Sequence, residues 1–212
     1  MSNSFKKNIS LAVLLILAFL PIIRWLFIAP LDLRFSNLNL ATTSLGQTTG
    51  LLGLMLFALT LIIGARLKVL GKFFSGLNNL YGWHHQIGAI AFCLLLFHPL
   101  FLVIKYIVVS LQSAALFFFP FQDPALTFGI IGLLFMIVLM VLTFYIKLKY
   151  QHWKISHKLM VVVFIFALLH VLLIASDVSR DGLLRFYVVG LGFVSLLVSG
   201  YKAYFSQYFK PL

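Results

Sequence analysis

Long apolar segments are the feature that most constrains how this chain can fold. A helix needs about 20 consecutive apolar residues to cross the roughly 30 Å hydrocarbon core of a bilayer. The sequence offers six such segments, at about residues 9–29, 46–66, 84–108, 125–146, 157–175 and 183–205. Because 63% of the 212 residues are hydrophobic and 9% are charged, little sequence remains for a water-soluble domain. We therefore predict an all-α integral membrane protein, with a six-transmembrane-helix bundle as a single domain over residues 1–212.

The basic residues indicate which way the helices run, because Lys and Arg concentrate in the cytoplasmic loops of membrane proteins. With a cytoplasmic N-terminus, eleven of the 16 Lys and Arg residues lie inside and five lie outside. The inner set is Lys6, Lys7, Arg66, Lys68, Lys72, Lys147, Lys149, Lys154, Lys158, Lys202 and Lys210, and the outer set is Arg24, Arg34, Lys105, Arg180 and Arg185. We predict that both termini face the cytoplasm, and we expect the membrane to be a bacterial cytoplasmic (inner) membrane.

The formal net charge of +12 does not indicate a nucleic-acid partner. The basic residues are dispersed among the ends of apolar spans and do not form one soluble basic face, so membrane lipid is the expected surrounding. The single cysteine, Cys93, lies inside the third span. A lone cysteine excludes a disulfide framework and a thiolate metal cluster, and the sequence has no CxxCH haem attachment motif.

Four of the six histidines occupy matching depths in two spans. His84 and His98 are 14 residues apart in the third span, and His157 and His170 are 13 apart in the fifth. Both spans run from inside to outside, and a rise of 1.5 Å per residue separates the members of each pair by about 20 Å. Histidines inside a membrane are costly unless they are paired or bind a metal. The spacing predicts two b-type haems, each with one axial histidine from each helix.

Helical periodicity favours a shared face for the two histidines of the third span, but not for the two histidines of the fifth. Fourteen residues at about 100° each return to within about 40° of the starting face, so His84 and His98 point toward one partner helix. From His85 the offset is about 140°, which favours an interface or haem-propionate contact for that residue. The spacing of His157 and His170 has the same unfavourable offset. We therefore predict an overlong turn or a π-bulge in the fifth span, or a tilt between the helices.

Three stretches carry a resemblance to a known family: "TGLLGLMLFALTLIIGAR", "LNNLYGWHHQIGAIAFCLLLFHPLFLV" and "YQHWKISHKLMVVVFIFALLHVLLI". Together they resemble the ferric-reductase-like transmembrane domain, which ferric reductases and NADPH oxidases share. The resemblance implies that His84 and His157 bind the inner haem iron, and that His98 and His170 bind the outer one. It also implies single-electron transfer from a cytoplasmic flavin and NAD(P)H donor to ferric iron or dioxygen at the outer face.

Full-length members of that family carry FAD and NAD(P)H on a C-terminal dehydrogenase region. This sequence has no GxGxxG turn after a strand, so we expect those cofactors on a missing domain or on a cytoplasmic flavin reductase subunit. The chain is then the membrane half of an oxidoreductase without its dehydrogenase domain. An alternative is the haem subunit of a quinol- or flavin-linked periplasmic reductase, of the methionine sulfoxide reductase type.

Haem propionates are best met by arginine, whose fork makes bidentate contacts with a carboxylate. The candidates are Arg66 and Lys68 for the inner haem, and Arg24, Arg34, Arg180 or Arg185 for the outer haem.

A hypothesis of another class is a non-redox transporter or scaffold whose histidines relay protons. Such a protein is expected to carry acidic residues at mid-membrane. The sequence has no Glu and no Asp within a span, which disfavours this alternative.

Overall fold

The computed structural model describes residues 3–121 and 123–204, which form eleven α-helices. Six regions are long and apolar enough to cross a membrane. They are α1 (Asn3–Ile28), α3 (Leu38–Gly64), α5 (Leu77–Ile107), α7 (Pro124–Phe144), the pair α8 (Tyr150–Lys158) and α9 (Met160–Leu173), and α11 (Gly182–Tyr204). The short helices are α2 (Leu31–Arg34), α4 (Lys68–Phe73), α6 (Leu111–Phe117) and α10 (Asp177–Arg180). The predicted all-helical fold with six candidate membrane-spanning helices is confirmed. Lys210 and the side chains of Lys6 and Lys7 lie outside the described part of the chain.

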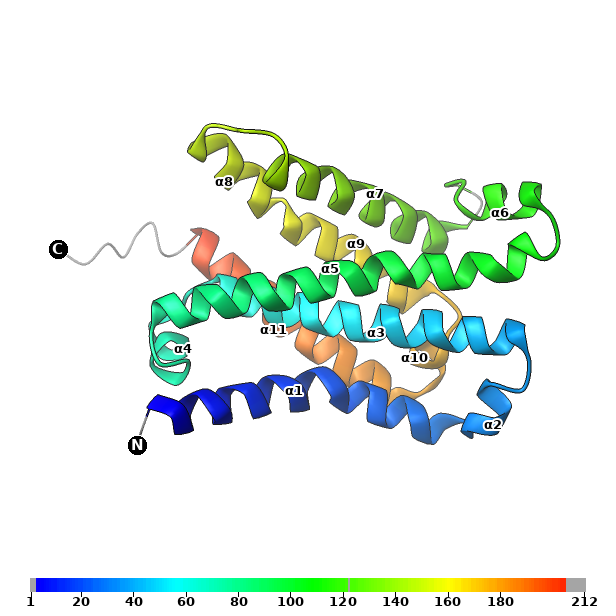
Figure 1. The fold of residues 1–212 in the computed structure, drawn as a ribbon, viewed down its shortest axis with the longest axis horizontal. Coiled ribbons are helices and arrows are strands. Elements are labelled where there is room, and N and C mark those ends of the chain that lie inside the picture. Colours follow the sequence, from blue (N-terminus) through cyan, green and yellow to red (C-terminus); the bar gives the residue numbers. More distant parts are fainter. Residues whose placement is uncertain (1–2, 122, 205–212) are drawn as a thin grey trace.

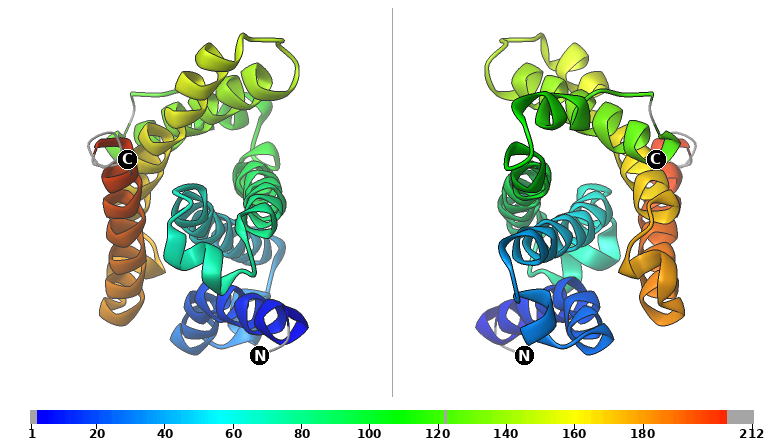
Figure 2. Two further views of the ribbon diagram at one scale, coloured as in Figure 1. Left: turned by 90° about the vertical axis from the view of Figure 1, so that its left-hand side faces the viewer. Right: turned by 90° about the vertical axis from the view of Figure 1, so that its right-hand side faces the viewer.

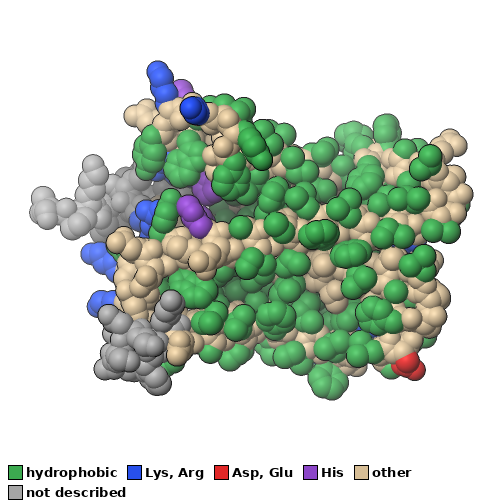
Figure 3. All heavy atoms as spheres, in the orientation of Figure 1, with side chains coloured by type: hydrophobic (Ala, Val, Ile, Leu, Met, Phe, Trp, Pro, Cys, Tyr) green, Lys and Arg blue, Asp and Glu red, His purple; other side chains and the backbone are tan. Residues whose placement is uncertain are grey.

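The connections gather at two opposite ends of the bundle. Helices α4 and α8 lie at one end, where α1 begins and α11 ends, and α2, α6 and α10 lie at the other (Figure 1). We call these the α4 end and the α2 end. Figure 3 shows Lys and Arg side chains at the α4 end of the visible face and an acidic side chain at the α2 end. The four acidic residues, Asp32, Asp123, Asp177 and Asp181, belong to α2, α10 and the starts of α7 and α11.

Helix α3 is the centre of the bundle. It runs antiparallel to α5 and also packs against α1, α9 and α11 (Figure 2). Phe57 of α3 meets Phe164 of α9 edge to face, with ring centroids 5.3 Å apart, and both side chains are buried. Because lipid is as apolar as these side chains, close packing of this kind is what holds membrane helices together.

Helix α3 begins at Leu38, well before the expected residue 46. The Oδ1 atom of Asn37 accepts a hydrogen bond from the Leu40 amide at 2.9 Å and so caps the helix. The Thr42 hydroxyl donates back to the Leu38 carbonyl at 2.9 Å, so a polar side chain is satisfied within the helix itself. Residues 38–45, which lie outside the expected span, therefore form the first turns of α3.

Helix α5 begins at Leu77 and not at the expected residue 84. It follows Gly76, whose φ of 118° lies in a region that only glycine adopts readily. The early start places His84 about two turns inside the helix, where its backbone is fully hydrogen-bonded. The position of this histidine is therefore fixed by regular helix geometry and not by a loop.

The fifth span is interrupted between its two histidines, as their spacing predicted. Helix α8 ends at Lys158 and α9 begins at Met160. At the break, the Leu159 amide bonds to the Ser156 carbonyl at 3.1 Å, and the Val162 amide bonds to the Leu159 carbonyl at 2.9 Å. These bonds reach back three residues, so the irregularity is a tightened turn and not the overlong turn or π-bulge that we named.

Candidate cofactor site

The structure brings the four histidines together as two pairs. The ring centroids of His84 on α5 and His157 on α8 are 5.9 Å apart. Those of His98 on α5 and His170 on α9 are 6.1 Å apart. Helix α5 packs along α3, and α9 packs along α7. The two histidine pairs join these two groups of helices through side chains.

Both distances fit a metal ion shared by two imidazoles. A metal–imidazole nitrogen bond is about 2 Å long, so two rings on opposite sides of one ion have centroids about 6 Å apart. Ordinary edge-to-face ring contacts cover the same range, so the distance does not identify a metal by itself. The hydrogen bonds of the rings supply the further information.

Three of the four histidines have their Nδ1 atom bonded to a backbone carbonyl. His84 Nδ1 lies 3.1 Å from the Thr60 oxygen, His98 Nδ1 lies 2.7 Å from the Gly46 oxygen, and His170 Nδ1 lies 2.7 Å from the Ala125 oxygen. A carbonyl can only accept, so Nδ1 carries the proton in each ring. In the neutral imidazole Nε2 then keeps its lone pair, and this is the form that binds a metal.

His157 is oriented differently. Among the described residues, its buried Nδ1 atom has no hydrogen-bond partner. The Trp153 ring, one helical turn earlier, stacks on the imidazole with centroids 5.5 Å apart and planes 12° apart. The ring of His157 is thus held by stacking and not by a hydrogen bond.

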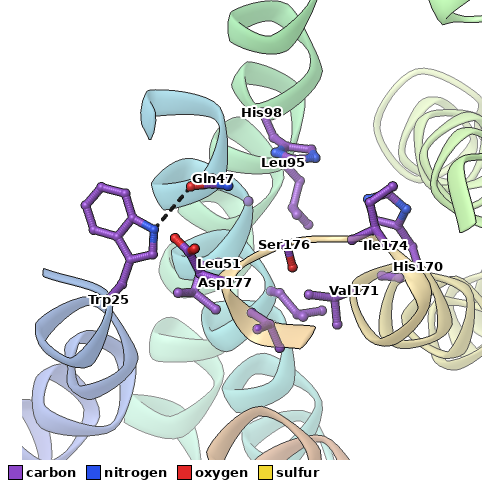
Figure 4. A pocket seen from close by; sticks show the side chains of 14 residues that line it. Trp25, Gln47, Leu51, Leu95, His98, His170, Val171, Ile174, Ser176 and Asp177 are labelled. Carbon is purple, nitrogen blue, oxygen red and sulfur yellow. Dashed lines mark hydrogen bonds between the residues drawn. The ribbon is translucent and has the colours of Figure 1, made fainter. Parts of the chain in front are cut away.

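A largely apolar cavity adjoins the His98–His170 pair (Figure 4). Its volume is about 110 Å³, well below the roughly 300–1,000 Å³ of a small-molecule site. Its wall includes Trp25, whose Nε1 donates to Gln47 Oε1 at 3.3 Å. Sequence reasoning did not identify either residue. The one available signal was a Gln side chain within an expected membrane span.

The sequence model of one protein family, the ferric reductase like transmembrane component, matches residues 49–168. This is more than half of the chain. The chain belongs to this family. The match includes His84, His98 and His157 and ends just before His170. It confirms the resemblance drawn from the sequence. No curated protein matches the chain.

In this ferric-reductase-like chain, Arg34 is already engaged by protein groups. Its side chain is 7% exposed, and Nη1 lies 3.0 Å from Asp177 Oδ2. Nη2 donates to the Trp25 carbonyl at 2.9 Å, and Nε donates to the Ala29 carbonyl at 3.3 Å. The guanidinium also stacks 3.6 Å above the centre of the Trp25 ring. Arg34 therefore braces the wall of the cavity, and a propionate contact for it stays a prediction.

The other basic candidates lie at the surface. Arg66 and Lys68 are exposed at the α4 end, and the Arg66 guanidinium stands 5.0 Å from the centre of the Tyr81 ring, one turn before His84 and His85. Arg180 is exposed on α10 at the α2 end. Each lies at the end of the bundle where its predicted propionate would be.

Arg24 of the ferric-reductase-like chain ties α1 to the start of α11. Its Nη2 and Nε atoms donate to the two carboxylate oxygens of Asp181, at 2.6 and 3.1 Å. Together with a bond from the Leu184 amide, this contact lowers the pKa of Asp181 below its ordinary value. The pair joins the first and last spans near the cavity that adjoins His98 and His170.

His85 and His152 are exposed, and neither is a member of the two facing pairs. The His85 ring packs 4.2 Å from Tyr81 and 5.8 Å from His84, so it lies beside the His84–His157 pair. The expected interface or haem-propionate contact of His85 stays a prediction.

Proposed function

We propose that this chain carries single electrons across the membrane through two b-type haems, each bound by one histidine from α5 and one from α8 or α9. The observation that carries the proposal is the arrangement of four histidines as two pairs, at two levels, on facing helices. The Nδ1–carbonyl bonds of His84, His98 and His170 add support, because they leave Nε2 of each ring free to bind iron. Bound haem supplies a one-electron carrier, because its iron changes charge by one.

The two pairs would hold different haems. His84 and His157 hold the iron nearer the α4 end, and His98 and His170 hold the iron nearer the α2 end. With two imidazoles as ligands, each iron would have no position left for the terminal acceptor, which would be reduced without binding the metal. The wall of the cavity around His98 and His170 is largely apolar.

The donor is a cytoplasmic flavin that NAD(P)H reduces, on another domain or subunit, and the acceptor is ferric iron or dioxygen at the outer face. Basic side chains concentrate at the α4 end and the four acidic residues at the α2 end, which supports an orientation with the α4 end in the cytoplasm. No acidic residue lies in the middle of a described span, so the proton-coupled transporter alternative lacks the groups that it needs.

The test is the visible spectrum of the purified full chain, produced in cells supplied with haem. We expect a reduced-minus-oxidised difference spectrum of b type, with two haems per chain by haemochromogen assay. The spectrum should keep its low-spin form when carbon monoxide is added, because bis-histidine iron has no open position. A folded, haem-supplied chain without b-type haem would disprove the proposal.

Orientation is tested by cysteine labelling in a Cys93→Ala background. Ser36 lies at the α2 end and Lys149 at the α4 end, and both are exposed. In intact cells, a membrane-impermeant maleimide should label Ser36→Cys, whereas Lys149→Cys should be labelled only after permeabilisation. The opposite pattern would reverse the proposed direction of electron flow and leave the haem assignment intact.

A further inference from the structure

Three glycines lie against three of the paired histidines, and we propose that they are positioning residues for the iron ligands. A Cβ atom added to Gly50 would lie 2.5 Å from His98 Nδ1, and one added to Gly129 would lie 2.7 Å from His170 Nδ1. A Cβ on Gly64 would lie 3.0 Å from His84 Cε1. The inference rests on the proposed function, since it concerns how the same four histidines are held.

Each glycine stands four residues after the carbonyl that its histidine uses. The pairs are Gly46 and Gly50 for His98, Thr60 and Gly64 for His84, and Ala125 and Gly129 for His170. In an α-helix the amide of residue i+4 bonds to the carbonyl of residue i, so residue i+4 stands over that carbonyl. A glycine there leaves the second lone pair of the oxygen open to a donor from another helix. We call such a carbonyl and glycine a glycine seat.

Helix α3 provides two seats at matching levels. Gly50 and Gly64 are 14 residues apart, as are His84 and His98, and α3 runs antiparallel to α5. Two helices with equal spacings therefore meet at both levels of the proposed haem site. The repeat supports a shared purpose for the two glycines, because helix packing alone requires only small residues and no fixed relation to a carbonyl.

Helix α7 provides one seat, and its sequence explains why His157 has none. Fourteen residues beyond Ala125 and Gly129 stand Leu139 and Thr143. The Thr143 hydroxyl donates to the Leu139 carbonyl at 2.7 Å, so the lone pair that a seat would offer is used within the helix. The His98–His170 pair is thus seated on both sides, whereas the His84–His157 pair is seated on one side only.

A seat fixes both the tautomer and the direction of its imidazole. Partners that hydrogen-bond to a ligating histidine raise its basicity, and losing one typically costs about 10–100-fold in metal affinity. An added methyl group at Gly50 or Gly129 must displace the ring, because the backbone of the neighbouring helix cannot move away freely. The same displacement breaks the Nδ1–carbonyl bond, which makes the imidazole a weaker electron donor to iron.

The experiment compares Gly50→Ala, Gly129→Ala and Gly64→Ala in the full chain. The first two lie on different helices, yet both should weaken the haem of the His98–His170 pair, by about 10–100-fold in affinity. Haem that remains there should show a raised midpoint potential and altered g values in its low-spin electron paramagnetic resonance spectrum. Gly64→Ala should change the other haem in the same way and leave the first one unaltered.

Two control variants separate a seat from ordinary packing. Gly53→Ala lies on α3 between the seats, and its Cβ would come 2.9 Å from Leu95 Cγ, so it crowds the same helix pair without touching a histidine. Gly190→Ala on α11 has nothing within 4 Å of the added atom. Both should keep two haems with unchanged potentials and g values.

The proposal is overturned if Gly53→Ala alters the same haem as Gly50→Ala to the same extent, or if Gly50→Ala and Gly129→Ala leave occupancy, potential and g values unchanged. Should one of the two fail to fold, the other decides, because α3 and α7 belong to different helix pairs. A wild-type chain without haem would instead disprove the proposed function itself. A wild-type chain with two haems and insensitive glycines would disprove only the seats.

Discussion

His98→Ala and His170→Ala each remove the same haem and leave the other in place. This is the largest functional effect that the structure predicts, because the two rings face each other and a six-coordinate low-spin iron needs both. The haem content should fall from two to one per chain for either variant, and a redox titration should lose the same component. His84→Ala and His157→Ala should remove the complementary component.

Double variants show whether the ligands pair across the helices. His98→Ala combined with His170→Ala empties one site only, so one haem should remain. His84→Ala combined with His98→Ala removes one ligand from each site, and both haems should be lost. If the pairs formed within one helix, these two results would be exchanged, so the double variants test the facing geometry directly.

His85→Ala and His152→Ala are the matched controls for these variants. Both residues are exposed histidines on helices that also carry a proposed ligand, α5 and α8, and neither belongs to a facing pair. Each variant should therefore keep two haems with unaltered low-spin spectra. If His85→Ala removed a haem and His84→Ala did not, the assignment of the ligand nearer the α4 end would be wrong.

The four histidines could be grouped from sequence because their spacing is a local property of helices. The 14-residue interval in α5 gives both the relative depth of its two histidines in the membrane and the helix face that they share. Neither inference requires knowledge of the tertiary structure. The 13-residue interval conveys depth only. It indicated an irregularity before His170, but the form of that irregularity, a tightened turn at Leu159, depends on how α8 meets its neighbours.

The partners of the histidines could not be found in the same way. The relation of Gly50 to His98 depends on the register between α3 and α5. That register is set by side-chain packing over the whole contact, which no short motif encodes. Arg34 was assigned to a propionate from its charge and position alone. Its contact with Asp177 joins residues 143 positions apart and appears only in the folded chain.

Arg34→Met should be the most destabilising replacement of a charged residue at the α2 end. The Arg34 side chain is 7% exposed and its partner Asp177 is 18% exposed, so removing the cation leaves a carboxylate that water reaches poorly. Breaking a fully buried pair costs about 3–5 kcal/mol, and the partial exposure of Asp177 reduces our expectation to about 2–3 kcal/mol. The Trp25 carbonyl and the Trp25 ring lose their contacts with Arg34 as well.

The free energy of unfolding in detergent micelles, followed by circular dichroism, measures this effect. Arg34→Met with Asp177→Leu should be less destabilising than Arg34→Met alone, because the double variant leaves no unpaired charge. Arg24→Met is the matched control: its pair with Asp181 also joins α1 to the C-terminal region, but the Arg24 side chain is 40% exposed and its loss should cost less. Equal losses for the two arginine variants would contradict the bracing of the cavity by Arg34.

Variants of Arg34 can also distinguish an effect on the stability of the protein from an effect on haem binding. Trp25 and Asp177 line the cavity beside His98 and His170, so loosening them should release the haem of that pair before the other. Arg34→Lys keeps the charge but lacks the planar fork that serves Asp177 and the Trp25 carbonyl together. It should therefore rescue part of the stability lost in Arg34→Met and little of the haem retention. Equal rescue of both would mean that the charge alone, and not the fork over Trp25, holds this wall in place.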